Sequence, residues 1–326
     1  MDIFTAPPVP GSAADYMPQA DSLGEGLWQI FSRALLALRP DLREGMGICF
    51  AIGAVVLLIS IVKLLPGAGE QLTDFVGSLG IGALLLSGSH SLISLARDTI
   101  GEISGYGKLL MGVLTSALAA QGGVTASTAL YVGTTIFDNL LCQIVVSILL
   151  PVVYLYLALC LGHGALGETM LKKLAGFLKW ASCWILKLIL YTFTGYMSIT
   201  GVVSGTTDAA ALKAAKITIS GAVPVVGGIL ADASEAVLVG AGVVRNAAGI
   251  YGILAILAIF AGPFLKIGCQ YLLVRLTGAV CAVFGARRCT ELVTDFSTAM
   301  GLLLACTGSV CLMQLISTVC FLRGVG

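Results

Sequence analysis

Apolar runs of about twenty residues recur along this chain, and they limit its fold more than any other feature. Met46–Leu65 carries one charged residue and Ala299–Leu322 carries none, and a transmembrane helix needs about 20 predominantly apolar residues. Only 11 % of the 326 residues are charged, against about 25 % in average soluble domains, so the chain lacks the charged surface of a soluble enzyme. The sequence therefore predicts an all-α, polytopic membrane protein.

Nine segments are candidates for membrane spans: Met46–Leu65, Phe75–Ala96, Ile103–Gln121, Leu140–Leu161, Ala181–Val203, Pro224–Val244, Ile250–Leu265, Ile267–Phe284 and Ala299–Leu322. The expected number is eight or nine, depending on whether Pro224–Val244 crosses the bilayer or only enters it from one side. Since the loops between them are too short for a soluble domain, residues 45–326 are expected to form a single membrane domain.

The first forty residues differ from the rest. Residues 1–21 contain several prolines and are expected to be a disordered tail. In residues 22–40, apolar side chains recur at helical spacing, which predicts an amphipathic helix that ends at Pro40. This helix lies either at the membrane interface or against the protein's own membrane domain.

The placement of basic residues predicts an orientation, because cytoplasmic loops are enriched in Lys and Arg. Arg33, Arg39 and Arg43 precede the first expected span, and Arg97 and Lys108 follow the second. With Pro224–Val244 as a span, this alternation predicts a cytoplasmic N-terminus and about nine crossings.

Residues 208–248 combine charges with helix-breaking residues. Lys213 and Lys216 are three residues apart, as are Asp232 and Glu235, so each pair lies on one helix face. If the chain folds back at Pro224, Lys216 meets Asp232 and Lys213 meets Glu235. The pattern predicts a re-entrant or broken helical hairpin.

Charges inside a bilayer are costly unless they are paired, so this hairpin either holds itself together or lines a polar cavity or a subunit contact. Arg275, inside the Ile267–Phe284 run, also needs a partner or a water-filled face, and Asp232 or Glu235 could serve as the partner. The candidate structural or pore-lining residues are Lys213, Lys216, Pro224, Gly227, Gly228, Asp232, Glu235, Arg245 and Arg275.

Other polar residues suggest little chemistry. Asp138-Asn139, at the start of the fourth expected span, is interpreted as a helix N-cap. The ten cysteines form no CxxC pair, which favours packing roles and predicts neither a metal nor a cofactor. Ser89-His90-Ser91 is accompanied by no hydrolase motif, so no enzymatic activity is expected. A net charge of +1 gives no reason to expect nucleic-acid binding.

Four sequence blocks in one order carry a resemblance to a known family: Lys213-x-x-Lys216, Ala222–Gly228, Asp232-Ala233-x-Glu235 and Arg245–Gly249. This order resembles the core signature of the stage III sporulation protein AE family, and weaker similarity extends over roughly residues 45–326.

The resemblance implies a multipass protein of the mother-cell membrane around the forespore. It implies a non-enzymatic part in a secretion-like channel complex, whose ATPase, ring-forming proteins and other membrane proteins would be partners. Glycine-rich spans are expected to pack against these partners or against a second copy of the chain. The rival interpretation is an autonomous secondary transporter with a broken-helix substrate site. The expected counterpart of its broken helix, Gln121–Asn139, has no paired charges, which favours the channel complex.

Overall fold

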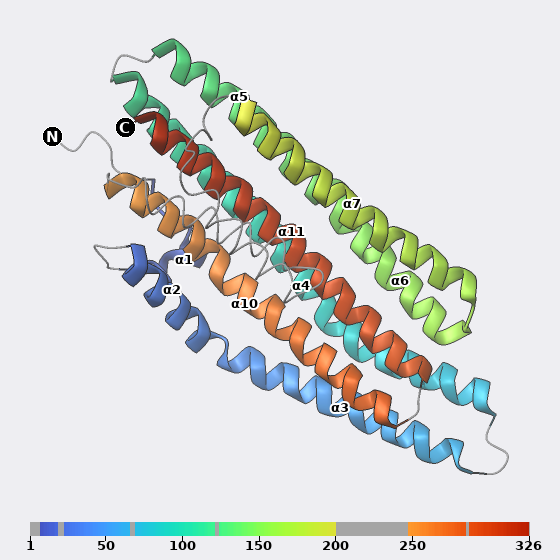
Figure 1. Cartoon of the computed structure of the whole chain (residues 1–326). Helices are drawn as coiled ribbons and strands as arrows, with labels where there is room; N and C mark the ends of the chain where they lie inside the picture. Colours follow the sequence, from blue (N-terminus) through green and yellow to red (C-terminus); the bar gives the residue numbers. More distant parts are fainter. Residues whose placement is uncertain are drawn as a thin grey trace, which may run out of the picture.

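The computed structural model describes residues 7–18, 23–65, 69–120, 124–199, 247–284 and 287–325. Every regular element within these ranges is helical, and the long helices lie side by side in one bundle (Figure 1). The all-α class is thereby confirmed. The elements are α1 (Gly11–Ala14), α2 (Leu23–Ala37), α3 (Arg39–Lys63), α4 (Glu70–Ala120), α5 (Val124–Ile144), η1 (Val145–Leu149), α6 (Leu150–Leu166), α7 (Thr169–Ile199), α10 (Ala247–Val283) and α11 (Arg287–Val325).

Six helices in the described residues are long and apolar enough to cross a membrane: Arg39–Lys63, Gln71–Ser116, Tyr131–Leu166, Thr169–Tyr196, Ile250–Val283 and Arg287–Val319. This number is below the expected eight or nine because two pairs of predicted spans are each one continuous helix. Phe75–Ala96 and residues 103–120 both belong to α4, and Ile250–Leu265 and residues 267–283 both belong to α10. Pro224–Val244 lies outside the described residues.

The residues between the predicted spans do not interrupt these helices. In α4 they include Arg97 and Asp98, which keep helical geometry with exposed side chains. In α10 the residue between the predicted spans is Lys266, and Pro263, three residues before it, lies inside the helix and removes one backbone hydrogen bond. Ile259 and Ile267, on either side of Pro263, are buried, and this burial offsets the lost bond.

A second proline is accommodated differently. Pro151 lies in the first turn of α6, directly after the π-helical turn η1. A π turn widens the helix locally, so it can absorb a residue that lacks an N–H without ending the helix. As a result α5, η1 and α6 follow one another without a loop, and the span expected from Leu140 is part of a longer run of helix that begins at Val124.

Helix α11 lies at the centre of the bundle. In the most apolar 18-residue stretch of this helix, 94 % of the residues are buried inside the protein, against 22–50 % in the corresponding stretches of the other five candidate spans. Many of its residues are small or carry hydroxyls, and the hydroxyls donate to carbonyls of the same helix, as Thr307 does to Leu303 and Ser309 to Ala305. Small side chains and internally bonded hydroxyls let neighbouring helices approach closely in an apolar setting.

The N-terminal elements pack on α10. In α2, Gly26, Ile30 and Ala34 are buried, whereas Phe31 and Leu35 of the apolar stripe predicted for 22–40 are exposed. Pro40 lies in the first turn of α3, and α2 ends before it. Within the segment expected to be a disordered tail, α1 contacts α10 and buries Ala13.

The connections α3–α4, α6–α7 and α10–α11 lie at one end of the bundle, which we call the loop end, and both chain termini lie at the other end (Figure 1). With 51 residues, α4 is about 77 Å long, far more than the ~30 Å hydrocarbon core. Arg97 and Lys108 lie inside α4 and not in a loop. These two basic residues therefore do not mark a loop between spans, so the predicted nine crossings are not confirmed, and the cytoplasmic N-terminus stays a prediction.

Candidate functional site

Most of the sequence-predicted site lies outside the described residues. This holds for Lys213, Lys216, Pro224, Gly227, Gly228, Asp232, Glu235 and Arg245, so the hairpin stays a prediction. Arg275 is described: its side chain is exposed on α10, and its guanidinium carbon lies 5.9 Å from the ring centroid of Tyr271. This cation–π contact, one turn away on the same helix, is a partner that the sequence analysis did not consider.

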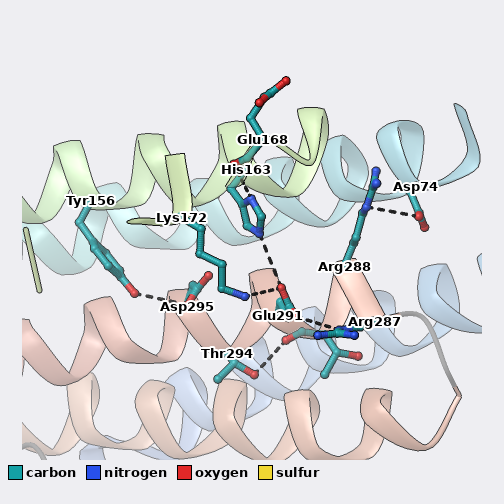
Figure 2. Close-up of polar contacts among 11 residues, drawn as sticks. Asp74, Tyr156, His163, Glu168, Lys172, Arg287, Arg288, Glu291, Thr294 and Asp295 are labelled. Carbon is teal, nitrogen blue, oxygen red and sulfur yellow. Dashed lines mark hydrogen bonds and ion pairs between the residues drawn. The ribbon is translucent and has the colours of Figure 1, made fainter. Parts of the chain in front are cut away.

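The structure instead brings polar residues together in two other places. The first, which we call the loop-end cluster, consists of Lys63, Asp74, His163, Lys172, Arg287, Arg288 and Glu291. Glu291 of α11 accepts from Lys172 Nζ at 2.7 Å and from Arg287 Nε at 3.1 Å, and His163 Nε2 lies 3.6 Å from its carboxylate (Figure 2). These side chains come from α6, α7 and α11, so Glu291 joins three helices.

The turn between α6 and α7 places His163 and Lys172 for this contact. Gly167 ends α6 in the left-handed conformation (φ 74°), and its N–H donates to the carbonyl of His163 at 2.8 Å. A Cβ at position 167 would lie 2.9 Å from the guanidinium of Arg288. Glycine is therefore required at 167 for both the backbone conformation and the close approach of Arg288.

Asp74 forms the other half of the loop-end cluster. Its side chain is 6 % exposed and lies 2.6 Å from Lys63 Nζ and 3.7 Å from Arg288 Nε. Lys63 ends α3, Asp74 lies near the start of α4 and Arg288 is the second residue of α11. Through these contacts the loop-end cluster ties α3, α4, α6, α7 and α11 together near their connections.

The second group, which we call the mid-bundle cluster, consists of Lys108, Asp138, Asn139 and Gln314. Gln314 Nε2 donates to Asp138 Oδ2, and Lys108 Nζ donates to Asn139 Oδ1 at 2.9 Å. Asp138 is 4 % exposed and Gln314 is 1 % exposed. The residues come from α4, α5 and α11, and Lys108 and Gln314 lie roughly three-quarters of the way along α4 and α11, counted from the loop end.

A glycine on α4 makes the contact with Gln314 possible. A Cβ at Gly107 would overlap the side-chain amide of Gln314, so this amide lies directly against the α4 backbone. The absence of a side chain at 107 therefore fixes the distance between α4 and α11 at the level of Asp138.

The mid-bundle cluster corrects the interpretation of Asp138-Asn139 as an N-cap. Both residues lie inside α5 (Val124–Ile144), because the uncharged residues before them are already helical. The sequence signal that could have identified them is an ionisable residue within an apolar run. Its partner Gln314 is 176 residues away, a separation at which sequence spacing carries no information.

The side chains of the two clusters mainly form ion pairs and hydrogen bonds that join helices to one another. Within the described residues, no group of three or more His, Cys, Asp or Glu side chains is placed to hold a metal ion, and the described cysteines are free thiols. The carboxylates bind the protein's own Lys, Arg and Gln side chains. The mid-bundle cluster also borders a small cavity, which is lined in part by Asp138 and Lys108.

Comparison with known proteins agrees with the family resemblance found in the sequence. The family whose profile matches residues 28–324 is described as "Stage III sporulation protein AE". The chain is 24 % identical over 242 residues to the curated protein of that name from Bacillus subtilis (strain 168), an alignment that covers 72 % of this chain and 61 % of that protein. The chain thus spans less than two thirds of the relative's length. No solved structure matches.

Proposed function

The chain belongs to the stage III sporulation protein AE family, and from this premise we propose that it is a non-enzymatic component of a channel complex that links mother cell and forespore. Its six long apolar helices fit a multipass membrane protein. The observation that best supports a part in an assembly is the use of its polar residues. Each cluster links at least three helices, α11 among them, by contacts within the protein.

This use of polar groups suits a scaffold. Lys63, Lys172, Arg287 and Arg288 are all engaged by Asp74 or Glu291, so their charge serves to hold helix ends in register. A rigid bundle with fixed helix ends can present constant surfaces to neighbouring subunits.

The location and partners that we propose are those implied by membership of the family. We place the protein in the mother-cell membrane around the forespore, with an ATPase, ring-forming proteins and other membrane proteins of the complex as partners, and with a second copy of the chain as a further candidate. The exposed aromatic face of α7, which includes Phe177, Trp180 and Trp184, offers an apolar surface to lipid or to such a subunit.

The test is genetic. Deletion of the gene in the organism that encodes it should abolish heat-resistant spores and lower the activity of a late reporter gene in the forespore. A copy expressed only in the mother cell should restore both, and a copy expressed only in the forespore should restore neither. Normal spore yield in the deletion strain, or rescue from the forespore alone, would contradict the proposal.

The mid-bundle cluster favours one alternative, an autonomous secondary transporter. A buried carboxylate beside a lysine, deep in long apolar helices, is typical of substrate and ion pathways. Liposomes that contain only the purified protein would decide between the two functions. Uptake of ²²Na⁺ or of radiolabelled amino acids that is lost in Asp138→Asn would favour the transporter. A channel component without its partners should show no such uptake.

A further inference from the structure

The cavity of the mid-bundle cluster has the size of one water molecule. It offers about 10 Å³ to the centre of a water-sized molecule, and it is lined by Lys108, Met111, Thr135, Asp138 and Ser317 among others. A site needs about this volume to hold one water, together with two to four polar partners. The lining therefore decides whether the space is polar enough to be occupied.

Three polar atoms of the lining are buried without a hydrogen-bond partner among the described residues. They are Asp138 Oδ1, Thr135 Oγ1 and Ser317 Oγ, and Asp138 and Ser317 are 4 % and 1 % exposed. A buried polar atom without a partner costs about 1–3 kcal/mol, and more if the group is charged. Since the three atoms come from residues that line one cavity, a single molecule could satisfy all of them.

We propose that an ordered water molecule binds in this cavity and links Asp138 to Ser317, Thr135 and Lys108. The water donates its two hydrogen bonds to Asp138 Oδ1 and to Thr135 Oγ1 and accepts one from the hydroxyl of Ser317, which leaves one acceptor position for Lys108. The ammonium group of Lys108 already donates to Asn139 and retains two further N–H groups, one of which can reach the same water. Asp138 and Lys108 thus form a water-mediated ion pair, to which α4, α5 and α11 each contribute residues.

Charge favours water over a cation of the same size. The oxygen atoms of this cavity would suit a small monovalent ion, since hard cations prefer carboxylate and other oxygen ligands. However, Lys108 lines the cavity and already balances the charge of Asp138. A further cation would leave an uncompensated positive charge in a poorly solvated interior, where the desolvation cost is several kcal/mol. A water molecule adds no charge.

Methionine oxidation tests this proposal in the protein as it exists. Short X-ray pulses split bound water into hydroxyl radicals, which oxidise a methionine next to that water. Met111 lines the cavity and is 3 % exposed, while Met300 and Met313 are equally buried at 2 % and 0 %. In detergent-solubilised protein we expect Met111 to be oxidised several-fold faster than Met300 and Met313. Equal rates for the three methionines would overturn the proposal.

Two further measurements sharpen the result. Ser317→Val should fill the cavity and lower the Met111 rate to that of Met313. Ser309→Val serves as the matched control, because Ser309 is on the same helix, is fully buried and bonds to Ala305; its Met111 rate should stay high. A Met111 rate that falls saturably with NaCl, but not with choline chloride, would identify the occupant as sodium and overturn the assignment to water.

Discussion

The loop-end and mid-bundle clusters both join α11 to its neighbours, but they do so with different chemistry. At the loop end, Glu291 lies near three basic groups, and its side chain is 28 % exposed. In the middle of the bundle, Asp138 is 4 % exposed, and its one direct partner in the described residues is the neutral amide of Gln314. Charges can therefore be numerous where water reaches them, whereas the mid-bundle cluster contains only two charged residues, Lys108 and Asp138.

This difference predicts which of the two clusters contributes more to the free energy of unfolding. Exposed ion pairs contribute about 0–1 kcal/mol because water and salt screen them. A buried carboxylate that loses a partner cannot be rescued by solvent, so the loss costs more. The comparison would fail if substitutions at the loop end were as destabilising as those at the mid-bundle cluster.

The largest effect is expected for Gln314→Ala. This change removes the amide that donates to Asp138 and leaves a buried carboxylate oxygen without a protein partner. We expect the free energy of unfolding to fall by about 2–4 kcal/mol, measured by denaturation in mixed detergent micelles.

Gln29→Ala is the matched control for this loss. Gln29 lies on α2 and makes an exposed contact with Glu25 at 3.4 Å. The control should change the free energy of unfolding by less than about 0.5 kcal/mol. Equal effects of the two substitutions would show that Gln314 contributes only its general packing.

A somewhat smaller effect is expected for Gly107→Ala. The new Cβ would overlap the Gln314 amide, so either the amide rotates away from Asp138 or α4 and α11 move apart. Overpacking of this kind costs about 1–3 kcal/mol. The measurement is the same unfolding experiment.

Gly105→Ala on the same helix separates this clash from helix propensity. A Cβ at position 105 meets no atom of the described residues within 4 Å. Alanine is a better helix former than glycine by about 0.8–1 kcal/mol, so this control should be neutral or stabilising. If Gly107→Ala were also stabilising, the close approach of α4 to Gln314 would be wrong.

Asp74→Ala tests the most buried part of the loop-end cluster. It removes the acceptor of Lys63 and Arg288, whose side chains are 23 % and 37 % exposed and can turn to water. We expect a loss of about 1–2 kcal/mol, between the values for exposed and buried pairs, in the same assay. Asp98→Asn is the control, because Asp98 is exposed on α4 and the change should be nearly neutral.

Sequence reasoning found the fold class but not the length of the helices. The spans expected at Met46–Leu65 and Ala299–Leu322 correspond to most of α3 and α11, because apolar runs of that length report membrane helices directly. The continuity of α4 through Arg97 was missed because a hydropathy run ends at a charge, whereas a helix does not. Only tertiary packing shows that the exposed side of α4 accommodates that charge.

The sequence also did not predict which of the candidate spans are the most buried. Helix α11 is the most buried of the six candidate spans, although it contains many hydroxyl residues, while the more apolar α3 is largely exposed. In a membrane, the outer surface faces lipid and can be as apolar as the core, so apolarity does not rank helices by depth. The predicted hairpin charges were inferred from local spacing alone, and the same approach could not have joined Asp138 to Gln314.

The smallest effect, and the sharpest contrast, is expected for Glu291→Gln. The neutral amide keeps the shape of the side chain and loses the charge that engages Lys172 and Arg287, so at low salt the free energy of unfolding should fall by at most about 1 kcal/mol. At 1 M salt the Debye length shrinks to about 3 Å, and the difference from the unsubstituted protein should become smaller still. The loss caused by Gln314→Ala should be unchanged at the same salt concentration, because ions do not reach Asp138. If both losses responded to salt alike, the mid-bundle cluster would have to be accessible to bulk water, and the distinction between the two clusters would disappear.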